Sequence, residues 1–153
     1  MTDRPGLRDL ELLHRRLEEL RHHIGSSVDY LDRGRPSPEQ EKAAWATITE
    51  STEKASSVCQ ELEHLVSVVR ENNPALLDRW VDVHQAILRE AKTEVECEAS
   101  DYLDEGFTKT ALFVINQEVE QWEEVRAGGR TYVIGNWYFL RNRRSIERKL
   151  FGF

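Results

Sequence analysis

The chain has 153 residues, 39% hydrophobic and 32% charged, with a formal net charge of -7. This length and apolar content match one domain that buries about two thirds of its unfolded surface. The longest apolar run, residues 111–115, is far shorter than the roughly 18–20 residues that span a bilayer, so we expect no integral membrane association. The first residues are charged throughout and do not resemble a signal peptide, which predicts a cytoplasmic location.

Apolar residues in the first part of the chain recur at alternating steps of three and four, the pattern that turns one seam of a helix toward a partner. This pattern predicts a helix over residues 7–32. Its seam residues are Leu10, Leu13, Leu17, Leu20, Ile24, Ser27 and Leu31. Gly34, Pro36 and Pro38 disfavour a continued helix, whereas Ser37 can cap the helix that follows.

A second helix is predicted over residues 38–71, with the same alternation sustained for more than three heptads. Its seam residues are Trp45, Ile48, Thr52, Ala55, Cys59, Leu62, Val66 and Val69. Asn72 and Asn73 end this helix, and Pro74 is suited to the first turn of a third helix over residues 74–105.

The third and fourth predicted helices continue the pattern. The seam of the third comprises Leu76, Trp80, Val83, Ile87, Ala91, Val95 and Tyr102. The fourth, over residues 108–127, has a seam of Leu112, Ile115, Val119 and Trp122 and stops at Gly128 and Gly129. Residues 130–135 are interpreted as a linker, although Thr131 to Ile134 would also suit a short strand.

Short turns between long amphipathic helices make consecutive helices antiparallel neighbours. The predicted fold is therefore all-α: an elongated up-down antiparallel bundle of four helices with coiled-coil-like seams over residues 1–129. Residues 130–153 supply the linker and a basic, aromatic C-terminal helix that packs on the bundle, all within a single domain. The first three helices are longer than the fourth, so part of their apolar seam must be covered by the tail, by a partner or by a second copy. We therefore expect a homo-oligomer.

The sequence offers little support for catalysis. It has no phosphate-binding loop, no His-Glu-x-x-His and no nucleophile elbow. Two cysteines, Cys59 and Cys97, form neither a disulfide framework nor a metal knuckle, and we expect both to be reduced. No catalytic residue, cofactor or metal ligand is predicted.

Two histidines raise the question of a metal site. Glu61 and His64 have the Glu-x-x-His spacing of helical di-iron proteins, but their heptad positions face solvent. Only a site shared across an oligomer interface would make them ligands. His84 lies beside Trp80 and Ile87 and could meet a carboxylate from another helix as a ligand or base. We expect instead a boundary histidine with one nitrogen hydrogen-bonded and the other in water.

Charge is divided unevenly along the chain. Residues 1–125 carry 14 Lys and Arg against 27 Asp and Glu, a net charge of -13, whereas residues 126–153 carry a net charge of +6. Within the acidic part, residues 90–124 have a net charge of -9. These two blocks supply the candidate partner-binding residues. They are Glu94, Glu96, Glu98, Asp101, Asp104, Glu105, Arg141, Arg143, Arg144, Arg148 and Lys149.

The C-terminal segment is interpreted as a helix capped by Asn136. One stripe of this helix contains Phe139, Ile146, Leu150 and Phe153. It can close the bundle core while its arginines pair with residues 94–105. Alternatively, basic and aromatic side chains can bind single-stranded nucleic acid or lie on an anionic membrane.

The function predicted from these features is a non-catalytic protein–protein interaction module, acting as an adaptor, an assembly subunit or an acidic inhibitor through helix faces and an acidic surface. The alternative is a nucleic-acid-binding subunit that uses the C-terminal helix. A more distant alternative is an oligomeric, ferritin-like metal-binding protein that uses Glu61 and His64. The identity of the protein partner does not follow from the sequence.

Deleting residues 136–153 tests whether the tail closes the core. If it does, the deletion exposes apolar surface and lowers Tm by about 5 °C or more in thermal melts. Replacing Arg141 and Arg144 with Ala should change Tm little, because exposed ion pairs contribute at most about 1 kcal/mol each. An unchanged Tm in the deletion variant would instead identify the tail as a free recognition element.

Overall fold

The computed structural model describes residues 5–98 and 105–135, together with residues 148 and 151. Four helices are described: α1 (Leu7–Arg33), α2 (Pro38–Asn72), α3 (Pro74–Glu98) and α4 (Glu105–Ala127). The described residues contain no strand, so the prediction of an all-helical chain is confirmed. The finer prediction of a regular up-down antiparallel bundle with coiled-coil seams stays a prediction.

The turn between α1 and α2 follows from its local chemistry. Ser37 Oγ accepts a hydrogen bond from the Gln40 amide at 3.2 Å, and Gln40 Oε1 accepts one from the Ser37 amide at 2.9 Å. This reciprocal capping box and Pro38 in the first turn begin α2. A Cβ atom at Gly34 would stand 2.6 Å from the Tyr30 carbonyl oxygen, so the end of α1 requires glycine.

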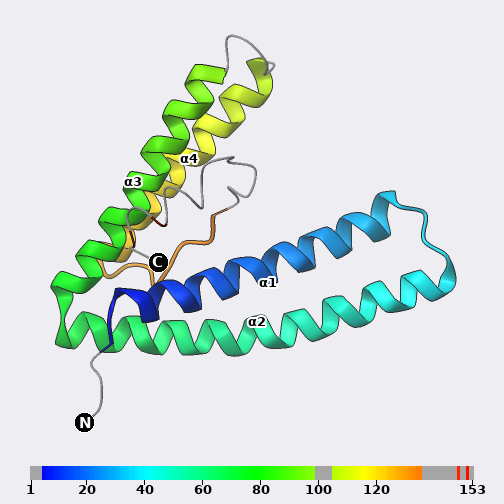
Figure 1. Ribbon diagram of the computed structural model, residues 1–153, viewed down its shortest axis with the longest axis horizontal. Coiled ribbons are helices and arrows are strands. Elements are labelled where there is room, and N and C mark those ends of the chain that lie inside the picture. The colour runs from blue at the N-terminus through cyan, green and yellow to red at the C-terminus, as the bar shows by residue number, and fades with distance from the viewer. Residues whose placement is uncertain (1–4, 99–104, 136–147, 149–150, 152–153) are drawn as a thin grey trace.

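The helices are arranged as two pairs. α1 packs mainly on α2 and α3 mainly on α4, and fewer contacts join α3 to α1 and α2. Figure 1 shows the two pairs diverging from a shared region, here called the vertex. Buried apolar side chains from all four helices make the core. They include Leu10 and Leu17 of α1, Leu62 and Val66 of α2, Trp80 and Val81 of α3, and Ile115 and Trp122 of α4.

The predicted seam of α2 is wrong near the helix start. Trp45 is 56% exposed and Thr52 is also exposed, whereas Ala44, Ser51 and Val58 are buried. A straight helix repeats every 3.6 residues and drifts by about 20° per heptad from a 3.5-residue repeat. The face that meets α1 is therefore displaced by one position from the predicted seam in this part of α2.

The half of the first pair farthest from the vertex has almost no core. We call residues 19–50 the distal hairpin; it comprises residues 19–33 of α1, the turn and residues 38–50 of α2. Ala44 is its one buried residue. The distal hairpin extends beyond the region where α3 and α4 lie (Figure 1). Leu20 and Ile24, at its inner end, pack partly against the core, and beyond them its two helices pack mainly on each other.

After α4 the chain returns to the vertex without regular structure. Gly128 has φ +93°, a conformation that favours glycine. Val133 is buried in the core, and the hydroxyl of Tyr132 lies 2.7 Å from Cys59 Sγ. The predicted linker is thus an extended segment that packs on the helices; we call residues 130–135 the extended segment.

Only two residues of the predicted C-terminal helix are described. Arg148 and Phe151 have helical backbone, and Phe151 is half-buried against the core. Most of the predicted helix, including its cap Asn136 and the residues Phe139, Ile146, Leu150 and Phe153, lies outside the described residues. Searching the described helices reveals none with the length and apolar character needed to cross a membrane.

Two leucines that are two residues apart test which face of α1 meets the core. Leu10 is fully buried and Leu12 is exposed. Leu10→Ala should lower the free energy of unfolding by about 2–5 kcal/mol, because it removes buried methyl groups and leaves a cavity. Leu12→Ala removes the same atoms from a solvated position and should cost less than about 1 kcal/mol. Urea denaturation measures both, and equal costs would contradict this placement of the core.

Candidate functional site

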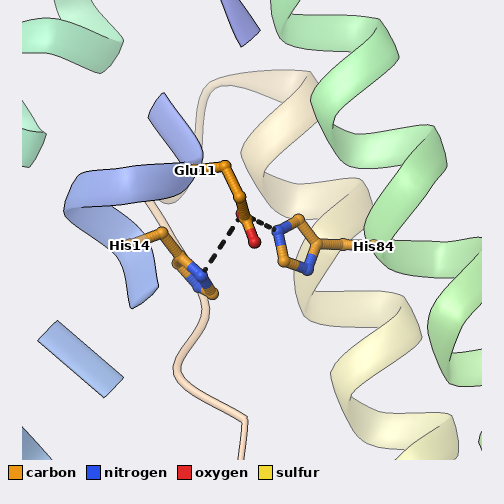
Figure 2. Close-up of side chains that lie close together, drawn as sticks. All are labelled: Glu11, His14 and His84. Carbon is orange, nitrogen blue, oxygen red and sulfur yellow. Dashed lines mark hydrogen bonds and ion pairs between the residues drawn. The ribbon is translucent and has the colours of Figure 1, made fainter. Parts of the chain in front are cut away.

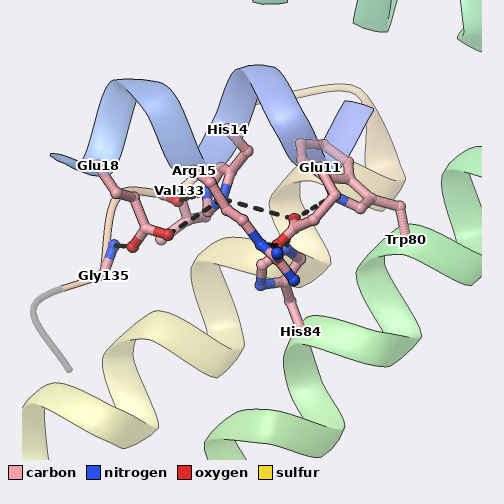
Figure 3. Close-up of polar contacts among 8 residues, drawn as sticks. All are labelled: Glu11, His14, Arg15, Glu18, Trp80, His84, Val133 and Gly135. Carbon is pink, nitrogen blue, oxygen red and sulfur yellow. Dashed lines mark hydrogen bonds and ion pairs between the residues drawn. The ribbon is translucent and has the colours of Figure 1, made fainter. Parts of the chain in front are cut away.

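A cluster of ionisable side chains is buried at the vertex, and we call it the polar cluster. Glu11, His14 and Glu18 come from α1, and His84 comes from α3 (Figure 3). Glu11 is 0% exposed, and none of the other three exceeds 5%. Spacings of three and four residues place the α1 members on one helix face, next to the leucine seam that meets α2.

The Glu11 carboxylate is the centre of the polar cluster. Its Oε1 accepts hydrogen bonds from Trp80 Nε1 at 3.1 Å and from His84 Nε2 at 2.7 Å. Its Oε2 accepts a hydrogen bond from Arg15 Nε at 3.3 Å. Burial alone would raise the pKa of Glu11. The combined effect of His84, His14 and the Trp80 hydrogen bond outweighs burial and lowers the pKa to about 2. Glu11 is therefore a buried carboxylate.

His14 lies between two carboxylates. Its Nε2 donates a hydrogen bond to the Val133 carbonyl oxygen at 2.6 Å. Its Nδ1 lies 3.2 Å from Glu18 Oε1 and 3.7 Å from Glu11 Oε1. Burial by itself would lower the pKa of His14. The neighbouring Glu18, followed by Glu11 and the Val133 carbonyl, has the larger effect and raises the pKa to about 9. At neutral pH His14 therefore carries a positive charge in the core.

The Glu18 carboxylate connects this arrangement to the extended segment. Its Oε2 accepts a hydrogen bond from the Gly135 amide at 3.2 Å. The extended segment is thus held by two side chains of α1, since His14 donates to Val133 and Glu18 accepts from Gly135 (Figure 3).

His84 stands in an aromatic environment. Its ring stacks on Trp122 with a centroid separation of 4.2 Å and an interplanar angle of 6°. The Phe151 ring centroid lies 5.5 Å away on the part of the tail that is described. Burial, assisted by His14, lowers the pKa of His84 in spite of Glu11. We therefore assign a neutral imidazole whose Nε2 holds the proton that bonds to Glu11.

The prediction that His84 lies at the boundary of the core is wrong, because its side chain is buried, whereas the expected hydrogen bond of one ring nitrogen is observed, to Glu11. The other possibility raised by the sequence, a carboxylate contact from another helix, is the one observed. Glu61 and His64 are both exposed, as their heptad positions predict. A second Glu-x-x-His, formed by Glu11 and His14, has the same spacing and is buried, which the heptad pattern does not predict.

The arrangement of the polar cluster limits its chemistry. Glu11, His14 and His84 each offer one ligand atom, and these three atoms lie within 4.8 Å of one another. A carboxylate and two imidazoles can share protons or coordinate a transition metal. Their burial and their hydrogen bonds also fit a polar network that joins helices.

The predicted partner-binding residues are mostly beyond the described part of the chain. Glu94 is half-buried and Glu96 exposed on α3, and Arg148 is exposed. The side chains of Glu98 and Glu105, and the whole of Asp101, Asp104, Arg141, Arg143, Arg144 and Lys149, lie outside the described residues. The proposed contact between the acidic and basic blocks therefore stays a prediction.

No protein-family model, no curated protein and no solved structure matches the chain. The polar cluster and the distal hairpin are therefore interpreted from their own geometry and chemistry.

Two glutamates of α1 test the contribution of the polar cluster to stability. Glu11→Ala leaves Trp80 and His84 without their buried acceptor and should cost about 3–5 kcal/mol of unfolding free energy. Glu19 is exposed on the same helix, and Glu19→Ala should change stability by no more than about 0.5 kcal/mol. Circular dichroism during urea denaturation measures the difference. A cost below about 1 kcal/mol for Glu11→Ala would show that the network is not needed for stability.

Proposed function

We propose that this protein is a non-catalytic protein–protein interaction module that self-associates through the distal hairpin. The observation that carries the proposal is the lack of core there, since Ala44 is the one buried residue between positions 19 and 50. In proteins, most helical stability comes from the packing of an apolar face. Two helices of this length without such a core need a further surface to cover them.

The distal hairpin also exposes large apolar side chains. Val28, Tyr30 and Trp45 are all exposed, and they occur on both of its helices. A single exposed apolar residue is ordinary on a protein surface. Three such residues on a helix pair without a core are more typical of an association surface.

A second copy of the chain is the occupant that we propose. Residues 19–50 carry four basic and six acidic side chains, a net charge of -2, whereas residues 90–124 carry -9. The distal hairpin can therefore approach its own copy with little repulsion. Two helix pairs related by a two-fold axis also make a four-helix bundle, in which each pair covers the other.

An open groove on the distal hairpin supports the same proposal. Small side chains line it from both helices: Ser26, Ser27, Ala43 and Ala44. Tyr30 lies at the same groove. Small residues allow a large apolar side chain of a second copy to approach the backbone closely.

Other elements of the functional prediction belong to this proposal. Pairing of two hairpins would form an antiparallel four-helix bundle between two copies, in addition to the up-down bundle that the sequence predicts within one chain. The acidic surface of α3 would remain available to a different, basic protein. Cys59 and Cys97 are not joined in a disulfide, which supports the proposed cytoplasmic location. Nucleic-acid binding through the tail is not preferred, because Phe151 packs against the core instead of standing free.

Sedimentation velocity over a range of protein concentrations tests self-association. We expect a dimer that dissociates on dilution, and we expect Val28→Ser with Trp45→Ser to weaken it at least tenfold, since both side chains lose their buried contact. Phe113→Ser is the matched control, because Phe113 is an exposed aromatic residue on α4. It should leave the dimer unchanged.

Two results would contradict the proposal. One is a monomer at every concentration. The other is a dimer that the Phe113 variant weakens as much as the double variant does, because such a dimer would use a different surface. Circular dichroism of each variant establishes that its helices remain folded.

A further inference from the structure

The polar cluster brings together three side chains of the types that transition metals favour as ligands. Glu11 and His14 are one turn apart on α1, and His84 faces them from α3 (Figure 2). Two imidazoles and one carboxylate form a ligand set that suits Zn²⁺ and its first-row neighbours. We propose that Glu11, His14 and His84 bind one divalent first-row transition-metal ion, with Zn²⁺ as the best-fitting species.

Two of the three ligand distances are close to those of a tetrahedral site, and all three ligand atoms lie within 4.8 Å of one another. Ligand atoms of a tetrahedral zinc ion stand about 3.4 Å apart, given metal–ligand bonds of about 2.1 Å. Glu11 Oε1 lies 3.7 Å from His14 Nδ1 and 2.7 Å from His84 Nε2. The Glu11–His84 pair would therefore separate by roughly 0.7 Å, about the range of a side-chain adjustment. The proton on His84 Nε2 would move to its Nδ1, and His14 would release its Nδ1 proton to solvent.

His14 is oriented as metal-binding histidines are. Its Nε2 donates to the Val133 carbonyl at 2.6 Å, which fixes the ring and makes Nδ1 the coordinating atom of the neutral imidazole. Nδ1 is buried and, among the described residues, has no partner with hydrogen-bond geometry. It nevertheless lies within ion-pair distance of Glu18 and Glu11. A metal ion at this point would take the place of the Nδ1 proton between the two carboxylates.

Glu18 completes the immediate surroundings. Its Oε1 lies 3.2 Å from His14 Nδ1, and its Oε2 is held by the Gly135 amide. Glu18 can supply the fourth ligand or accept a hydrogen bond from a water molecule in that position. Together with Glu11, which also pairs with Arg15, it provides two carboxylates beside the proposed ion.

The alternative explanation is a polar network that holds a proton and no metal. Such a network costs desolvation energy, and apolar side chains of similar volume often replace it without loss of stability. Metal binding would give the two imidazoles and two carboxylates that meet here a role beyond holding a proton. The ligands are buried and Trp122 stacks on His84, so the ion would have a closed, structural site that joins α1 to α3.

Metal titration of the full chain tests the proposal. The purified protein is treated with a chelator, dialysed and titrated with Zn²⁺ in a calorimeter. We expect one ion per chain, and a rise in Tm of about 5–10 °C when free Zn²⁺ is a hundredfold above Kd. His14→Gln and His84→Gln should each weaken binding at least tenfold.

Matched variants separate this site from adventitious binding. Glu61→Gln with His64→Gln alters an exposed pair of the same Glu-x-x-His spacing and should leave affinity unchanged. His22→Gln with His23→Gln alters two exposed histidines of α1 and should also leave it unchanged. Binding that either control abolishes would place the metal at the surface and overturn the proposal.

Co²⁺ provides a test that does not depend on the variants being folded. Bound to the unaltered chain through nitrogen and oxygen in four-coordinate geometry, it should give intense visible absorption bands that Zn²⁺ removes by competition. Weak six-coordinate bands would contradict the proposed site. So would an unchanged Tm with no measurable uptake of Zn²⁺, which would identify the polar cluster as a proton-holding network alone.

Discussion

The buried carboxylate of Glu11 is the constraint on which the arrangement of the two helix pairs depends. A charge removed from water must be satisfied by donors that the fold supplies. Its donors come from α1 itself, through Arg15, and from α3, through Trp80 and His84. Because direct packing between the pairs is sparse compared with packing within each pair, these directional bonds fix how α3 meets α1. Apolar contact alone would let α3 slide along α1, whereas the hydrogen bonds to Glu11 favour a single arrangement of the two helices.

The same face of α1 also determines the path of the chain after α4. His14 and Glu18 bond to Val133 and Gly135, so the extended segment returns to the vertex and places Val133 in the core. Each of these two hydrogen bonds has one charged partner, the protonated His14 or the Glu18 carboxylate beside it, and is therefore stronger than a bond between neutral groups. An extended segment without a ladder of its own is thereby held by side chains of a helix more than a hundred residues earlier. Phe151 then packs beside His84.

Much of the fold follows from local sequence, but the polar cluster does not. The three-four repeat, the Ser37 capping box and Pro74 place the helices and their turns, because these signals act within a few residues. The pattern assigns polar residues beside a seam to solvent, which is right for Glu61 and His64 and wrong for Glu11 and His14. The two pairs have identical spacing. They differ in what packs against them, and long-range packing leaves no trace in the local repeat.

The vertex and the distal hairpin therefore differ in the interactions that stabilise them. At the vertex, apolar burial and charged hydrogen bonds act together, and α1 is covered by more than one helix. In the distal hairpin the same two helices continue with one buried residue, Ala44, so their order depends on the contact between α1 and α2 and on the capped turn. Local stability follows buried contacts, which makes the distal hairpin the easier part of the helix pair to open. A surface that covers it would stabilise α1 and α2 along their whole length, and the rigid vertex would keep α3 and α4 clear of that surface.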